Sequence, residues 1–181
     1  MTDAQNFIPG SVFELLSGQF IWGQAARLMA FLGLVIGFLI KLAAVPFHSW
    51  LPDAHVEAPT PISMILAAIL LKIGGYGLLR TAYTIFPEGA IYYSFGIGAL
   101  GVCAIIYAAL TALAMQDLKK MIAYASIAHM GFVLLGLASL THEGVHGALY
   151  QMVSHGLIVA LLFGIVGVLQ DRAQDRSIEN Y

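Results

Sequence analysis

The fold of this chain is decided by residues 31–55, FLGLVIGFLIKLAAVPFHSWLPDAH. The first half is an almost unbroken apolar run, which is typical of a helix that crosses a bilayer. Lys41 interrupts the run, and Pro46 follows it. Proline lacks a backbone N–H and its ring clashes with the preceding turn, so it kinks or breaks a helix. The pattern predicts a membrane span broken at Pro46; the alternative is a continuous span that is only kinked there.

The length of this span favours the break. Apolar residues and the segment after the proline together cover residues 24–56, which is about 50 Å of helix at 1.5 Å per residue. The hydrocarbon core of a bilayer is only about 30 Å thick. Broken helices occur in membranes where the freed backbone is buried in protein or faces water, and transporters place ion sites at such breaks.

The rest of the chain has the composition of a membrane protein. Of 181 residues, 60% are hydrophobic and 10% charged, whereas soluble domains carry about 25% charged residues. A net charge of −2 without a basic run argues against nucleic-acid binding, and the single cysteine, Cys103, excludes a disulfide framework. We therefore predict an all-α, polytopic transmembrane helix bundle of five spans, the first broken at a proline.

Apolar runs and turn residues set the expected boundaries. The five spans are expected at about residues 24–56 (broken), 60–84, 92–114, 118–141 and 145–169. Residues 1–23 are expected to form an N-terminal loop or interfacial segment and not a signal peptide, and residues 170–181 a polar tail. Basic residues are more numerous on the side that carries Lys119 and Lys120, which makes that side cytoplasmic by the positive-inside rule.

Four of the five spans carry an ionisable side chain near their centre: Lys41, Lys72, His129 and His155. A charged group at the bilayer centre costs at least about 2.5–3.5 kcal/mol, so the two lysines in particular need a functional reason. Burial lowers the pKa of a lysine and histidine titrates near neutral pH, so the row predicts a path for protons. Hydroxyl groups that could add links to this path are those of Tyr76, Tyr124, Ser126 and Ser154. For either histidine taken alone, a packing role is the alternative.

No span has an aspartate or glutamate near its centre. Two buried lysines without an acid in their own chain must stay neutral or pair with a carboxylate from elsewhere. We therefore expect this chain to be a truncated or split piece of a larger unit, or to dock against a chain that supplies the acid.

Three stretches carry a resemblance to a known family. They are VPFHSWLPDAHVEAPTPISMILAAILLKIGGYGLLR (residues 45–80), QDLKKMIAYASIAHMGFVLLG (116–136) and YQMVSHGLIVALLFGIVG (150–167). In this order they resemble the antiporter-like, proton-translocating membrane subunits of respiratory complex I. Within that group they are most similar to the M-type subunit, which is called subunit 4 in mitochondria and has counterparts in cyanobacteria and chloroplasts.

The resemblance implies roles for particular residues. Lys41 would be the lysine of the broken helix, which in the family pairs with a glutamate on an earlier helix. Lys72 would be the central lysine of the next helix, and His129 and His155 part of the central hydrophilic axis. It also implies other membrane subunits and lipid as partners, and an energy-transducing membrane such as a bacterial inner or thylakoid-type membrane. Quinone, flavin and iron–sulfur clusters are expected elsewhere in the complex, with no cofactor or redox centre in this chain.

Three other functions compete with this interpretation. A subunit of a multi-subunit sodium/proton antiporter would share the lysines and the proline break, and a purely structural membrane subunit would not need the lysines. His142, Glu143 and His146 spell H-E-x-x-H, the zinc-protease motif that needs a helix to place both histidines on one face. The motif lies between two expected spans and lacks a third ligand, so we expect no metal site and no catalytic residue here.

Overall fold

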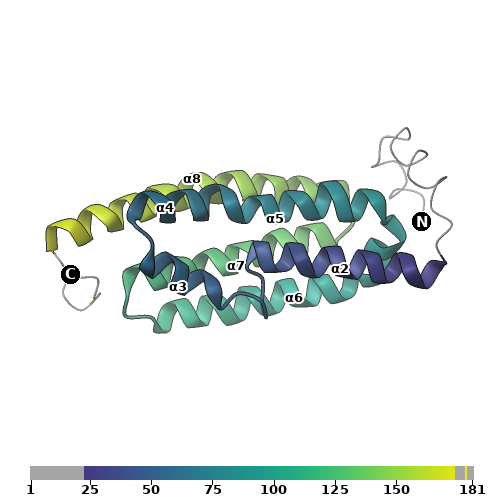
Figure 1. Cartoon of the computed structure of the whole chain (residues 1–181), viewed down its shortest axis with the longest axis horizontal. Helices are drawn as coiled ribbons and strands as arrows, with labels where there is room; N and C mark the ends of the chain where they lie inside the picture. The colour runs from purple at the N-terminus through teal and green to yellow at the C-terminus, as the bar shows by residue number, and fades with distance from the viewer. Residues whose placement is uncertain (1–22, 174–177, 179–181) are drawn as a thin grey trace.

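The computed structural model describes residues 23–173 and residue 178, and this part of the chain is helical, without β-strands (Figure 1). The helices are α2 (Gln24–Leu42), α3 (Trp50–Glu57), α4 (Thr60–Ile65), η2 (Leu66–Leu70), α5 (Leu71–Gly77), η3 (Leu78–Tyr83), α6 (Pro87–Ala114), α7 (Leu118–Ala138) and α8 (His142–Ala173). Segments α4 to η3 form one continuous helix, in which η2 and η3 are π-helical. Among the described residues, five helices are long and apolar enough to cross a membrane. The predicted all-α polytopic bundle, with its first span broken, is confirmed.

The break in the first span begins before the proline. Helix α2 ends at Leu42, because Ala43 adopts a left-handed conformation with φ 55°. The backbone N–H groups of Ala43 and Ala44 close the helix on carbonyls of its last turn, as in a common helix C-cap. The Val45–Pro46 peptide bond is cis, and the helix resumes as α3. In Figure 1, α3 lies beyond the end of α2 along the long axis of the bundle.

The remaining helices extend past some of the expected limits. Helix α6 begins at Pro87, five residues before the expected span, because proline in the first turn needs no N–H partner and already has a helical φ. Helix α8 continues through residues 170–173 of the expected polar tail. The expected N-terminal loop lies outside the described residues except for Gly23, and of the tail beyond Ala173 only Ile178 is described.

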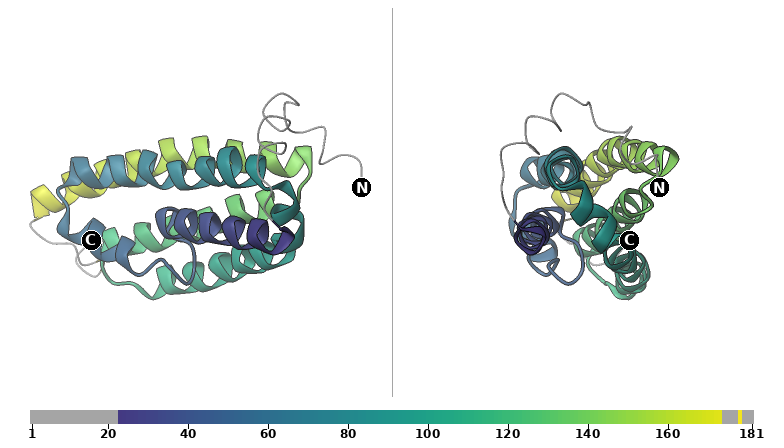
Figure 2. Two further views of the ribbon diagram at one scale, coloured as in Figure 1. Left: turned by 45° about the vertical axis from the view of Figure 1, so that its right-hand side comes forward. Right: turned by 90° about the vertical axis from the view of Figure 1, so that its right-hand side faces the viewer.

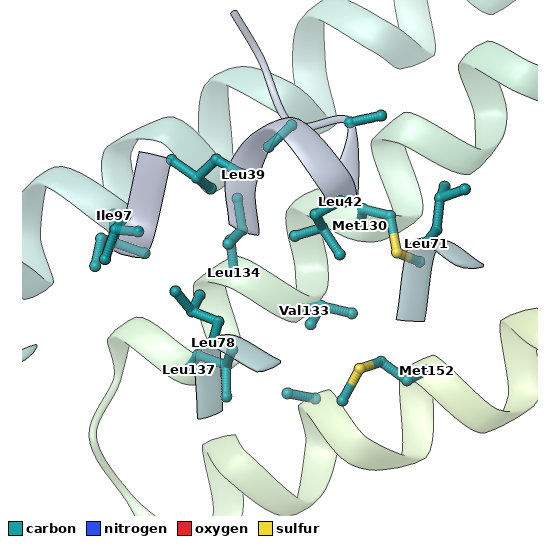
Figure 3. Packing of buried hydrophobic residues seen from close by; sticks show 14 of the residues in the cluster. Leu39, Leu42, Leu71, Leu78, Ile97, Met130, Val133, Leu134, Leu137 and Met152 are labelled. Carbon is teal, nitrogen blue, oxygen red and sulfur yellow. The ribbon is translucent and has the colours of Figure 1, made fainter. Parts of the chain in front are cut away.

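Helix α7 is the most buried of the membrane-spanning helices in the described part of the chain. It packs against α6, α8 and α3, and the view along the bundle axis in Figure 2 shows it between α6 and α8. Apolar side chains gain little by leaving lipid for a helix interface, so close packing stabilises such contacts. Figure 3 shows this core, which includes Leu39, Leu42, Leu71, Leu78, Met130, Val133, Leu134, Leu137 and Met152.

Two ion pairs mark opposite ends of the bundle. At one end Arg27 Nη1 lies 3.2 Å from Glu88 Oε1. At the other, which we call the Lys119 end because Lys119 lies in the first turn of α7 there, Lys120 Nζ lies 3.9 Å from Asp53 Oδ1. Both pairs involve exposed side chains, so each contributes little to stability.

Asp117 caps α7 at the Lys119 end. Its Oδ1 accepts hydrogen bonds from the backbone N–H groups of Lys119 (2.8 Å) and Lys120 (3.2 Å). Replacing Asp117 with Ala should cost about 1 kcal/mol of helix stability. The amides of this first turn should then exchange with deuterium about fivefold faster. Asp117→Asn retains a capping oxygen and should exchange nearly as the native chain does; equal exchange in both variants would contradict the capping role.

Candidate functional site

Lys72 lies near the middle of the second span, on the short segment α5 between the two π-helical segments. Its ammonium donates a hydrogen bond to the carbonyl oxygen of Ala67, five residues earlier. In the π-helical segment η2 the backbone bonds also run over five residues, as from Leu71 N–H to Leu66 O. π-Helical turns inside α-helices are frequent at functional sites. Here they flank the lysine on both sides.

His155 and His129 meet the lysine from two other helices. Lys72 Nζ lies 2.7 Å from Nδ1 of His155, which is buried on α8. The His129 ring on α7 lies with its centroid 5.0 Å from that of His155. Gln151 precedes His155 by one turn of α8 and therefore shares its face, and its Nε2 lies 2.9 Å from His129 Nδ1. We call these four residues the Lys72 cluster.

The cluster is suited to moving a proton along hydrogen bonds. An ammonium group only donates, so a charged Lys72 requires Nδ1 of His155 to accept. A neutral imidazole that accepts at Nδ1 carries its proton at Nε2, and the two nitrogens can exchange roles after protonation. Gln151 Nε2 is likewise hydrogen-bonded to Nδ1 of His129, so Nε2 of His129 remains for another partner.

Lys41 stands apart from the Lys72 cluster. It lies in the last turn of α2 and its side chain is exposed. Its ammonium group has no hydrogen bond or ion pair with another residue within 23–173. Its neighbour Leu42 nevertheless packs closely on the second span, since a Cβ on Gly74 would lie only 2.7 Å from Leu42 N. The backbones that carry the two lysines are therefore adjacent, although the side chains do not meet.

The four hydroxyl groups proposed as accessory links lie at the edges of the cluster or outside it. Tyr76 is exposed and lines a groove of about 610 Å³ that also includes Lys72. The hydroxyls of Ser126 and Ser154 each donate to a carbonyl of their own helix. The ring of Tyr124 lies 6.2 Å from that of His48. Within the described part of the chain, none of the four has a hydrogen bond to a member of the cluster.

Several functional candidates were missed in the sequence. Gln151 had one usable signal, its spacing of four residues from His155. The local pattern around Lys119 is typical of a solvated loop, yet this lysine is 3% exposed and its Nζ lies 3.4 Å from the carbonyl oxygen of Ala58. His55 is fully buried on α3. Burial of these two depends on tertiary packing, which a local pattern does not reveal.

The H-E-x-x-H motif is helical, although the sequence pattern places it between two expected spans. His142, Glu143 and His146 lie in the first two turns of α8 and are all exposed. Among residues 23–173 and 178, no group of three or more His, Cys, Asp and Glu side chains could hold a metal ion. Nothing in the described geometry therefore points to a zinc site.

Comparisons with known proteins agree with one another. A relative from Nostoc sp., NAD(P)H-quinone oxidoreductase chain 4-3, is 51% identical over 156 residues, which is 86% of this chain and 28% of the relative. Another from Rickettsia bellii, NADH-quinone oxidoreductase subunit M, is 54% identical over 146 residues, 81% of this chain and 30% of the relative. The chain thus spans less than a third of the length of these two relatives.

Solved structures share the arrangement of helices. A chain of respiratory complex I from Thermus thermophilus matches with a TM-score of 0.84 and 33% identity, covering 92% of this chain and 35% of that one. A chain of the Mrp complex from Dietzia sp. matches with a TM-score of 0.75, covering 88% and 32%, but at 20% identity it shows the fold alone.

The family profile described as the transmembrane region of NADH:quinone oxidoreductase and Mrp antiporters matches residues 8–181. This match covers nearly the whole chain, and it agrees with the identities of the relatives and with the five apolar helices. The chain is a multi-pass integral membrane protein and belongs to the NADH:quinone oxidoreductase/Mrp antiporter transmembrane family.

Proposed function

We propose that this chain forms part of a transmembrane proton path in a complex I-like NAD(P)H- or ferredoxin:quinone oxidoreductase. The observation that carries the proposal is the direct contact of Lys72 with His155, at 2.7 Å, inside membrane-spanning helices. Ionisable side chains inside a membrane are energetically costly and commonly mark proton pathways. A lysine and a histidine at hydrogen-bond distance there can pass a proton directly between them. The names of the relatives, both quinone oxidoreductase chains, support the setting.

The proposed step conserves protons and needs no redox change. The Lys72 ammonium gives one proton to Nδ1 of His155, which leaves a neutral amine and an imidazolium. The imidazolium then releases the proton at Nε2, toward His129 or a water beside it. Gln151 orients His129 by holding its Nδ1. The order Lys72, His155, His129 follows the order of the contacts.

Lys41 would serve the same path from the broken helix. Because its side chain is exposed and has no acidic partner within the described residues, we propose that a carboxylate from another segment or subunit pairs with it. Other membrane subunits and lipid would cover the apolar outer face. Quinone, flavin and iron–sulfur clusters would be bound by other subunits, and this chain would act as a translocating membrane subunit of the enzyme without a redox centre.

Replacing His155 with Gln tests the proposed path. Gln can hold a hydrogen bond but cannot take up a proton at neutral pH. We expect proton translocation by the complete complex in proteoliposomes to fall by about tenfold or more, since a positioned acid–base group contributes at least that much. His146→Gln makes the same change on an exposed turn of the same helix and should be neutral. Equal translocation in the two variants would contradict the proposal.

A further inference from the structure

His55 is a buried histidine without hydrogen bonds. Its side chain has no exposed surface, and neither Nδ1 nor Nε2 has a partner among the described residues. A neutral imidazole carries one donor and one acceptor, and buried polar groups in proteins are nearly always paired. Two ring nitrogens without hydrogen-bond partners on one buried histidine therefore call for an explanation. The proposed proton step at Lys72 does not involve this residue.

The ring is held in place by apolar contacts and by its backbone. It stacks on Phe163 of α8, with centroids 4.4 Å apart and an interplanar angle of 19°. Phe163 packs in a buried cluster with Ala67 of the second span. Ser63 Oγ donates a hydrogen bond to the His55 carbonyl oxygen at 3.2 Å. These contacts fix the ring and leave its nitrogens unoccupied.

The ammonium of Lys72 lies back along its own helix, in the direction of the turn that contacts His55. Lys72 donates to the carbonyl oxygen of Ala67. Its charged end therefore lies nearer the N-terminal end of the second span than its Cα does. Ser63, which bonds to the His55 backbone, precedes Ala67 by four residues, or about 6 Å of helix. Neither nitrogen of the imidazole bonds directly to the ammonium, so a proton would pass between them through water.

Lys119 lies on the other side of His55. It is buried at the start of α7, and its Nζ lies 3.4 Å from the carbonyl oxygen of Ala58, three residues after His55. His55 therefore lies between a buried cation at one end of the bundle and the cluster at mid-span.

We propose that His55 is a proton relay between the Lys119 end of the bundle and Lys72, through water. The inference rests on the proposed function of the Lys72 cluster. A proton that arrives by water binds one ring nitrogen and gives imidazolium. The other nitrogen releases its proton by way of water to the neutral Lys72 amine, which has already passed its own proton to His155. The step leaves Lys72 as the ammonium and His55 neutral, with its proton on the nitrogen that took it up. Exchange of the ring proton through water then restores the starting tautomer.

Two substitutions separate a relay from a packing role. His55→Phe keeps an aromatic ring against Phe163 but has no nitrogen, and His55→Gln keeps hydrogen-bonding groups without taking up protons. In the complete complex in proteoliposomes, we expect both to slow proton translocation by about tenfold. His146→Gln, a change on an exposed turn of α8, should translocate as the native complex does. Recovery in His55→Gln would indicate a purely structural histidine and overturn the relay.

The same experiment separates this inference from the proposed function. If Lys72→Met abolishes translocation while both His55 variants keep the native rate, the relay is wrong and the cluster stands. If Lys72→Met also keeps the native rate, the proposed function itself fails. A map of the native complex that resolves water needs no variant: waters on both ring nitrogens, leading toward Lys72, are expected. A dry ring, or nitrogens bonded to protein groups that lead elsewhere, would overturn the relay.

Discussion

Replacing Lys72 with Met is expected to abolish proton translocation, with a loss of at least about a hundredfold, which is the scale of a general acid–base step. Met has a similar length and no charge, so it fits the half-buried site on α5 without strain. The change removes the donor to both His155 and Ala67. Electron transfer from the donor to quinone should slow as well if the two processes are tightly coupled. The measurement is the initial rate of vesicle acidification, with the quinone reduction rate recorded separately in the same vesicles.

A second substitution distinguishes proton exchange from mere positive charge. Lys72→Arg keeps the charge, but an arginine does not release its proton in a protein. A path that uses the neutral amine should fail with Arg as it does with Met, whereas a structural cation should be rescued by Arg. Lys120→Met serves as the control, since Lys120 forms only a long surface pair with Asp53. Native translocation in Lys72→Arg would refute the idea that this lysine changes protonation.

The helices could be predicted because lipid imposes a simple rule on sequence. Each span must satisfy its own backbone in the absence of water, so apolar runs of about 20 residues are helices. The break was harder to position. Pro46 predicted it, but the helix ends earlier, at Leu42, because Ala43 takes a left-handed conformation. That conformation is unusual for alanine, and nothing in the local pattern indicates it.

The candidate site was predictable at the residues whose side chains are energetically costly to place in a membrane. An ionisable group at mid-span is conspicuous whatever surrounds it, which is why Lys72, His129 and His155 were found and why they lie together in the bundle. Gln151 and His55 are less conspicuous, because their meaning depends on which helices become neighbours. Ser126 and Ser154 were predicted from the sequence as accessory links, but neither bonds to the cluster. Hydroxyls in a helix often bond to their own backbone, as both do here.

Replacing Gly131 with Ala is expected to have the largest effect on assembly. A Cβ there would lie 2.7 Å from the carbonyl oxygen of Gly101 and 3.0 Å from the backbone nitrogen of Ile105, both on α6. Backbone atoms cannot rotate away as a side chain can, so α6 and α7 must separate. Overpacking of this kind costs about 1–3 kcal/mol, and it occurs between helices that close packing stabilises. The yield of assembled complex and its half-life on heating should both fall.

Gly96 provides the matched control, because it lies on α6 and a Cβ there meets nothing within 4 Å among the described residues. Gly96→Ala removes the same conformational freedom and should leave assembly unchanged or slightly improved, since alanine favours helix over glycine. Gly101→Ala should resemble Gly131→Ala, for its Cβ would meet Gly131 O at 2.9 Å. Since both changes separate the same two helices, the double variant should lose less than the sum of the single losses. Native assembly in both single variants would contradict the close backbone contact of α6 with α7 at Gly101 and Gly131.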